Sequence, residues 1–243
     1  MEDNTLKQET PQFGKYDLIA ELAKYFPNAN ASTVVGIGDD AAVIAPNEEN
    51  VVSTTKVFME NVHFDLTYVP LLHLGYKVIT VAISDLLGMN AVPTQVIVNI
   101  SISNRFDLKA VNELLEGVQT CCDNAHIDVV GLDLSTSRKD LIITVTALGE
   151  CEAARLVTRK GAKENELVCV SGDFAAAYTG LLLLEREKKV FESNPDVQPD
   201  FTGKDYLLRR QLRPEPRLDI VEALRREDIL PTAMTNVSDG IAA

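Results

Sequence analysis

Apolar residues recur at helical spacing in three segments of the first half of the chain. The first segment, Tyr16–Phe26, places its apolar side chains on one face and ends at Pro27. The second, Leu72–Met89, is apolar almost throughout, and the third is Leu108–Asn124. We therefore predict a helix in each of these three segments.

Short segments with strand character lie between and after these helices. Aliphatic and β-branched residues dominate them, and turn-forming residues separate them. The predicted strands are Ala41–Ala45, Val51–Thr55, Val96–Ile102, Ile127–Val130 and Leu141–Gly149. Strands interleaved with helices predict an α/β fold (α+β, with mixed sheets) and argue against a helical bundle or a β-sandwich.

A charged, glycine-containing connector near residues 149–163 divides the pattern in two. We predict an N-terminal α/β domain over residues 1–150 and the start of a second α/β domain over residues 151–243. The elements expected in this second unit are a strand at Leu167–Ser171 and helices at Ala175–Lys189 and Pro216–Glu227. Because the unit has few strands and ends in a turn, we expect it to be incomplete.

Composition narrows the class of protein. The 243 residues include 23 Lys and Arg against 36 Asp and Glu, a formal net charge of −13. This acidity argues against nucleic acid as a partner, since chains that bind it generally carry excess positive charge. No apolar run is long enough for a membrane span, and the N-terminus lacks a signal-peptide pattern. We therefore expect no membrane association, a cytoplasmic location and reduced cysteines.

Acidic residues at turns and at the ends of predicted elements are the candidate ligands of a functional site. Asp40 follows a glycine turn, Asp133 follows a predicted strand, and Asp239 lies in the final turn. Asp85 is the most informative, because a carboxylate within VITVAISDLLGM lies near the core and needs a partner or a cation. Converging carboxylates and hydroxyls would form a Mg²⁺–phosphate site. Each residue also has a simpler explanation, as a turn residue, a helix cap or, for Asp85, a salt-bridged residue near a helix end.

Standard phosphate-binding and kinase motifs are missing from the sequence, including the P-loop and the dinucleotide-binding glycine pattern. Among the three histidines, His63 lies in a polar and aromatic run, where a structural hydrogen bond and substrate binding are equally compatible with it. Residue chemistry alone therefore leaves the reaction open.

Several short motifs occur in a fixed order along the chain. They are Gly36-Ile37-Gly38-Asp39-Asp40, Ser53-Thr54-Thr55, Val62-His63-Phe64, Ser84-Asp85-Leu86, Arg159 with Gly161-Ala162-Lys163, Arg213-Pro214-Glu215-Pro216-Arg217 and Ser238-Asp239-Gly240. In order and spacing the chain resembles the thiamine-monophosphate kinases, which share a family of ATP-binding enzymes with aminoimidazole ribonucleotide synthetase. The resemblance begins at about Phe13 and covers nearly all that follows, whereas the last third of such enzymes has no counterpart.

The resemblance implies a two-domain, aminoimidazole ribonucleotide synthetase-like fold and a homodimer formed through the N-terminal sheets. It also implies transfer of the γ-phosphoryl group of ATP to thiamine monophosphate with Mg²⁺. By this resemblance, the metal ligands would be Asp40, Thr54, Thr55, Asp85, Asp133 and Asp239. The resemblance also implies that the nucleotide contacts Leu132, Asp133, Arg159 and Ser238, and that the substrate contacts His63. No residue is assigned as a covalent nucleophile, because phosphoryl transfer depends on positioning and charge neutralisation.

Four places depart from the family pattern, and one of them is Gly131-Leu132-Asp133-Leu134, where the family has Gly-Gly-Asp-Thr. Lys56 stands where the family has a metal-binding aspartate, and Asn236 replaces another acidic residue. Leu115 replaces a tyrosine that lies near the nucleotide in the family. The ammonium group of Lys56 would either repel Mg²⁺ or take the place of a metal and pair directly with Asp85 or a phosphate.

The leading interpretation is a thiamine-monophosphate-kinase-like enzyme. Lys56, Asn236 and Leu115 favour instead a catalytically degenerate homologue that only binds nucleotide or thiamine phosphate, or acts as a dimeric partner. A further alternative is an enzyme of the same fold that acts on another phosphorylated substrate.

Overall fold

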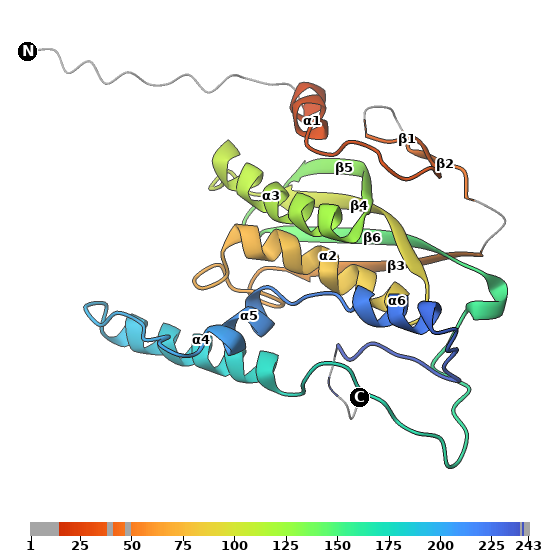
Figure 1. The fold of residues 1–243 in the computed structure, drawn as a ribbon. Coiled ribbons are helices and arrows are strands. Elements are labelled where there is room, and N and C mark those ends of the chain that lie inside the picture. Colours follow the sequence, from red (N-terminus) through yellow and green to blue (C-terminus); the bar gives the residue numbers. More distant parts are fainter. Residues whose placement is uncertain (1–14, 38–40, 47–49, 239, 241–243) are drawn as a thin grey trace, which may run out of the picture.

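The computed structural model describes residues 15–37, 41–46, 50–238 and 240. The elements are α1 (Lys15–Ala23), β1 (Thr33–Val35), β2 (Val43–Ile44), β3 (Asn50–Met59), α2 (Leu71–Leu87), β4 (Val92–Ile102), α3 (Leu108–Ala125), β5 (Asp128–Thr136), β6 (Ile142–Cys151), the 3₁₀ helix η1 (Ala153–Arg155), α4 (Ala176–Ser193), α5 (Asp205–Leu212) and α6 (Leu218–Arg226). Figure 1 shows this arrangement, with α4 and α5 beside the layer of helices that covers the sheet.

A four-stranded mixed sheet is the centre of the fold. Its strand order is β3-β6-β4-β5, with β4 and β5 parallel and the other two pairs antiparallel. The short strands β1 and β2 form a separate antiparallel pair. Mixed strand directions together with packed helices confirm the predicted α/β class.

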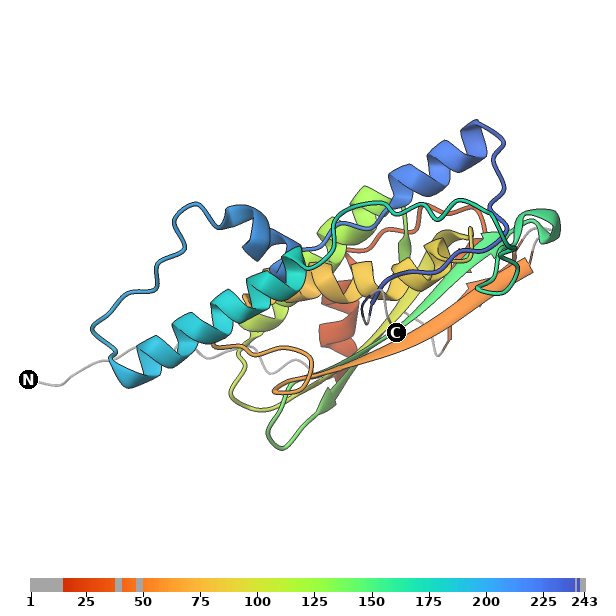
Figure 2. The ribbon, with the colours of Figure 1, turned by 90° about the horizontal axis from the view of Figure 1, so that it is seen from below.

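Helices α2 and α3 lie side by side on one face of the sheet (Figures 1 and 2). In β6, Ile143, Val145 and Ala147 are at most 1% exposed on the face that these helices cover. The residues between them on the strand, such as Thr144 and Thr146, point to the opposite face and are only half-buried. The two faces of the sheet are therefore chemically different, and side chains on neighbouring positions of one strand serve different environments.

The crossing of α2 and α3 depends on two glycines. A Cβ atom at Gly75 would lie 2.0 Å from the carbonyl oxygen of Leu114, and one at Gly117 would lie 2.0 Å from that of Leu72. Real Cβ atoms do not approach backbone oxygen so closely, so each helix has a glycine where the other helix's backbone meets it. This close crossing fixes the position of α2, whose last turn carries Asp85.

A buried polar network fastens the segment before β1 to the sheet. The carboxylate of Asp128, 2% exposed, accepts hydrogen bonds from the amides of Ala29 at 2.8 Å and Asn30 at 3.0 Å. Burial opposes ionisation of Asp128, but these and other hydrogen bonds outweigh it and lower the pKa of the carboxyl group. The amide of Gln95, 1% exposed, donates to Ser32 Oγ at 2.7 Å. The chain that leads toward the glycine turn is thus held at the edge of the sheet.

The strand predicted at Leu167–Ser171 is wrong, because these residues have no strand structure. A strand needs a neighbour for its backbone hydrogen bonds, and within the described residues none pairs with this segment. Leu167 is 91% exposed and Val168 is 92% exposed. Helix α5 was not predicted, since it is only eight residues long, half of them polar, and follows a long loop.

Among the described residues, none of the helices combines the length and the apolar character that crossing a membrane requires.

We predict that Gly75→Ala lowers the free energy of unfolding by at least ~2 kcal/mol, because the added methyl group forces α2 and α3 apart. Urea denaturation followed by circular dichroism measures this change. Glu116→Ala, an exposed substitution on α3 next to Gly117, should stay within ~0.5 kcal/mol of the unmodified chain. If Gly75→Ala and Glu116→Ala unfold at the same urea concentration, the proposed role of the close crossing is contradicted.

Candidate functional site

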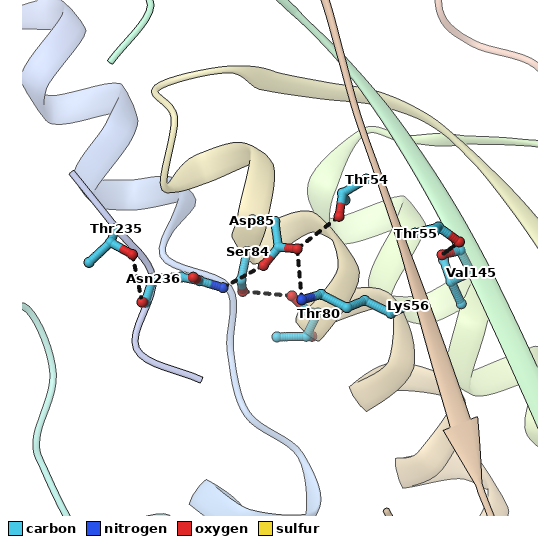
Figure 3. Close-up of polar contacts among 9 residues, drawn as sticks. All are labelled: Thr54, Thr55, Lys56, Thr80, Ser84, Asp85, Val145, Thr235 and Asn236. Carbon is cyan, nitrogen blue, oxygen red and sulfur yellow. Dashed lines mark hydrogen bonds and ion pairs between the residues drawn. The ribbon is translucent and has the colours of Figure 1, made fainter. Parts of the chain in front are cut away.

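The side chain of Asp85, in the last turn of α2, is the centre of a compact polar cluster (Figure 3). Its Oδ2 atom accepts a hydrogen bond from Thr54 Oγ1 at 2.8 Å and forms an ion pair with Lys56 Nζ at 2.8 Å. Its Oδ1 atom accepts a hydrogen bond from Asn236 Nδ2 at 2.6 Å. Both carboxylate oxygens therefore have protein donors, as expected for a charged group in an apolar helix.

Strand geometry explains why Thr54 and Lys56 reach Asp85 and Thr55 does not. Side chains alternate along β3, so Thr54 and Lys56 point to the face covered by α2. Thr55 points to the other face, where its Oγ1 atom lies 3.4 Å from the carbonyl oxygen of Val145 and accepts a hydrogen bond from Thr146 Oγ1 at 3.2 Å. Neighbouring residues of β3 therefore point to opposite faces of the sheet. Thr54 and Lys56 lie beside Asp85, and Thr55 lies on the face away from the helices, here called the outer face.

Asn236 lies 151 residues after Asp85, in the irregular segment that follows α6, here called the C-terminal segment. This segment passes close to the end of α2, where a Cβ atom at Gly88 would lie 2.9 Å from the Asn236 amide nitrogen. A hydrogen bond from the Met234 amide to the carbonyl of Thr158, 3.1 Å long, holds the same segment beside the loop after η1. Three distant parts of the sequence therefore meet at one carboxylate.

The ion pair is partly shielded from water. The side chains of Lys56 and Asp85 are 31% and 24% exposed. Partial burial makes an unpaired charge costly, so each group depends on the other more than an exposed pair would. Lys56 is thus a partly buried, paired member of the site.

A cavity of about 470 Å³ opens beside the cluster. Such a volume lies in the ordinary range for small-molecule sites. Its lining residues are Val52, Ser53, Thr54, Asp85, Leu86, Gly88, Met89, Thr158, Arg159, Lys160, Met234, Thr235 and Asn236. The cavity brings three predicted site residues together, namely Thr54, Asp85 and Arg159, and it adds the positive charge of Lys160.

The described residues around Asp85 do not fit a resident divalent cation. Mg²⁺ is held by oxygen ligands, but the ammonium group of Lys56 lies 2.8 Å from Asp85 Oδ2, where its charge would repel a cation, and Oδ1 already accepts a hydrogen bond from Asn236. Nowhere in the described part of the chain do three His, Cys, Asp or Glu side chains converge as a metal site would require. Of the two roles considered for Lys56, direct pairing with Asp85 is the one observed.

Asp133 and Leu132, on β5, lie apart from the cluster. Asp133 is in register with Asn99 on β4, which pairs with Thr144 on β6, and this row belongs to the outer face. Three strand steps separate β5 from β3 in the sheet. Leu132 is 7% exposed and belongs to the core. Within one copy of the chain, Leu132 and Asp133 therefore do not line the Asp85 cavity, and their contacts with metal and nucleotide stay predictions.

His63 lies in the turn beyond β3. Its Nδ1 atom accepts a hydrogen bond from the Met59 amide at 3.0 Å, and its ring meets Phe58 edge to face with centroids 6.3 Å apart. These contacts correspond to the structural alternative considered for His63, and its contact with substrate stays a prediction. Leu115, 2% exposed, is a core residue of α3.

Ser238 is exposed and follows the segment that carries Asn236. Asp40 and Asp239, both predicted as metal ligands, lie outside the described residues. Sequence reasoning missed Thr158, Lys160, Met234 and Thr235, which line the cavity. No periodic pattern marks them, because they belong to irregular segments whose meeting depends on the tertiary fold.

Comparison with known proteins places this geometry in a family. Residues 38–151 match the family described as AIR synthase related protein, N-terminal domain. The thiamine-monophosphate kinase of Bacillus subtilis (strain 168) is 32% identical over 219 residues, which make up 88% of this chain and 63% of the relative. That of Aquifex aeolicus (strain VF5) is 31% identical over 236 residues, 97% of this chain and 69% of the relative. The chain thus spans less than two thirds of the first relative's length.

Solved structures agree with the sequence comparison. The crystal structure of thiamine monophosphate kinase from Aquifex aeolicus matches 93% of this chain and 68% of its own, with a TM-score of 0.70 and 27% identity. AaThiL complexed with AMPPCP and TMP matches 97% of this chain and 69% of its own, with a TM-score of 0.69 and 29% identity. The chain therefore belongs to the thiamine-monophosphate kinase family.

Proposed function

We propose that this chain binds ATP and thiamine monophosphate in the cytoplasm and transfers the γ-phosphoryl group to give thiamine diphosphate. The observation that carries the proposal is the cavity beside Asp85, where Thr54, Asp85 and Arg159 meet. The matched structure AaThiL was complexed with AMPPCP and TMP, a triphosphate analogue and the proposed acceptor. Family membership supplies the reaction, and the cavity supplies a place for it.

The residues of the cavity suit phosphate positioning. A phosphate oxygen of thiamine monophosphate would attack the γ-phosphorus, and the bond from that phosphorus to the β-phosphate oxygen would break to release ADP. The guanidinium of Arg159 and the ammonium of Lys160 lie where they can hold phosphate oxygens. Asp85, which lines the cavity, forms an ion pair with Lys56. These groups orient and neutralise phosphates, and none forms a covalent intermediate.

Mg²⁺ is proposed as a companion of the nucleotide. Kinases of this kind use a divalent metal to neutralise the phosphates of ATP. Because the residues at Asp85 do not fit a resident ion, the proposal gives Asp85 no role in metal binding here. The assignments of Asp40, Thr55, Asp133 and Asp239 as ligands stay predictions of the family resemblance.

A second candidate is a homologue that binds nucleotide or thiamine phosphate without transferring phosphate. The observation in its favour is the same cluster, since Lys56 and Asn236 replace two acidic residues and occupy the oxygens of Asp85. A site with fewer metal charges stabilises less of the charge that develops during transfer. Binding with negligible turnover would identify this candidate.

A homodimer formed through the outer face of the sheet is also part of the proposal. On this face Val57 is 49% exposed, and Thr144 and Thr146 are half-buried. A second copy placed against it would bury apolar strand residues that water now reaches. The outer face is therefore the surface to alter in testing the dimer.

The unmodified chain should convert thiamine monophosphate to thiamine diphosphate slowly. Lys56→Asp combined with Asn236→Asp should raise the rate by about tenfold or more, because two carboxylates become available for cations that offset transition-state charge. Thiamine diphosphate formed from ATP is measured by chromatography. Lys56→Met with Asn236→Asp is the control, since it removes the ammonium without supplying its replacement carboxylate.

The outcomes separate the two candidates. Binding of ATP and thiamine monophosphate by calorimetry, with no turnover in any of these proteins, would support the second candidate. Failure of the unmodified chain and of both variants to bind either ligand would contradict the proposed function.

Sedimentation velocity of the full chain should show a dimer at micromolar concentration, typical of an interface of standard size. Val57→Lys should weaken the dimer by about tenfold or more, because it places a charge at an apolar position of the outer face. Val34→Lys, at a 60% exposed position of β1, should leave the dimer intact. A chain that sediments as a monomer throughout this range would refute the dimer.

A further inference from the structure

A second cavity, of about 350 Å³, lies away from the Asp85 cluster and is lined by four arginines. They are Arg209, Arg210, Arg213 and Arg217. The remaining charged residues of the lining are Asp173 and Glu215, and Asp219 pairs with Arg217, so this group of side chains has a formal charge of 4 − 3 = +1. The whole chain carries −13. Such a concentration of guanidinium groups in an acidic protein needs a specific explanation.

The internal carboxylates do not satisfy all of these guanidinium groups. Arg217 is occupied, since its Nε and Nη2 atoms each donate to Asp219 at 2.9 Å. Arg210 is satisfied only in part, because it forms a long ion pair with Asp173, 3.6 Å from Nε to Oδ2, while its buried Nε atom has no hydrogen-bond partner. A buried donor without an acceptor is unfavourable, and an oxyanion in the cavity would supply one.

The arrangement of the arginines is also restrained. Arg213 lies over the ring of Tyr76, with its Cζ atom 4.5 Å from the ring centroid. This cation–π contact restrains the position of the guanidinium group. Arg209 and Arg210 occupy the last turn of α5, which holds their backbones in helical geometry. A restrained guanidinium loses less conformational entropy when it binds an anion.

Gly172 completes the wall of the cavity. Its φ of +87° lies in the left-handed region that favours glycine. A Cβ atom there would lie 3.5 Å from Arg210 Nη2 and 3.6 Å from Arg217 Nη1. The backbone before α4 therefore turns close to the guanidinium groups. Helix α4 begins nearby without a side-chain cap, which adds a favourable but minor field for an anion.

We propose that this arginine cavity binds a phosphate dianion, either inorganic phosphate or the phosphate of a small monoester. Planar guanidinium groups match tetrahedral oxyanions through paired N–H donors, and the polar lining suits a small charged ligand. No residue is shared between this cavity and the one beside Asp85. The site is thus additional to the proposed nucleotide and thiamine-phosphate site.

Two substitutions of opposite sign test the proposal. Arg209→Gln should weaken the binding of inorganic phosphate by about tenfold, because it removes a charge-assisted donor. Asp173→Asn should strengthen it several-fold, since it removes the carboxylate that faces Arg210. Isothermal titration calorimetry on the full chain measures both. A variant that merely damages the fold would not bind phosphate more tightly.

Arg226→Gln is the matched control, because Arg226 is an exposed arginine that pairs with its neighbour Glu227. Its phosphate affinity should equal that of the unmodified chain. The absence of saturable binding at millimolar phosphate, or equal losses in Arg209→Gln and Arg226→Gln, would overturn the proposal. Titration with glycerol 3-phosphate distinguishes the two sources: tighter binding than inorganic phosphate identifies a monoester, and weaker binding identifies the free ion.

Discussion

The ion pair between Lys56 and Asp85 is the constraint on which the described site depends. A carboxylate in the last turn of an apolar helix needs donors on both oxygens, and this chain supplies them from β3 and from the C-terminal segment. Once Lys56 takes one of these positions, the carboxylate is neutralised within the protein. The cavity beside it is lined by Asp85, Thr54 and Asn236, the residues of this cluster.

This pair needs the architecture around it. Lys56 reaches α2 because alternate residues of β3 face the helices, and α2 is held in place by its close crossing with α3 at Gly75 and Gly117. Asn236 reaches Asp85 because the C-terminal segment passes close to Gly88, where a Cβ atom would lie 2.9 Å from the Asn236 amide nitrogen. The same cluster that joins strand, helix and C-terminal segment also forms one wall of the cavity. Asp85 therefore both joins these elements and lines the cavity.

Much of the fold was predictable, because the longer helices and the strands of the sheet have clear apolar periods. The need of Asp85 for a partner was also predictable from its apolar surroundings, and Lys56 was identified as its possible partner. The pairing with both Thr54 and Asn236 was beyond local sequence patterns, since it depends on the tertiary path of the chain. The segment 167–171 shows the opposite error, where strand-forming residues lack the neighbour that a strand requires.

The most direct test measures Mn²⁺ binding by electron paramagnetic resonance without nucleotide, comparing the unmodified chain with Asp85→Asn. If Lys56 and Asn236 occupy the Asp85 carboxylate, the two binding curves should coincide, because Asp85 contributes no metal ligand. Loss of a Mn²⁺ site in Asp85→Asn, with the fold intact by circular dichroism, would contradict the account and show that Asp85 binds a cation despite its pairing with Lys56.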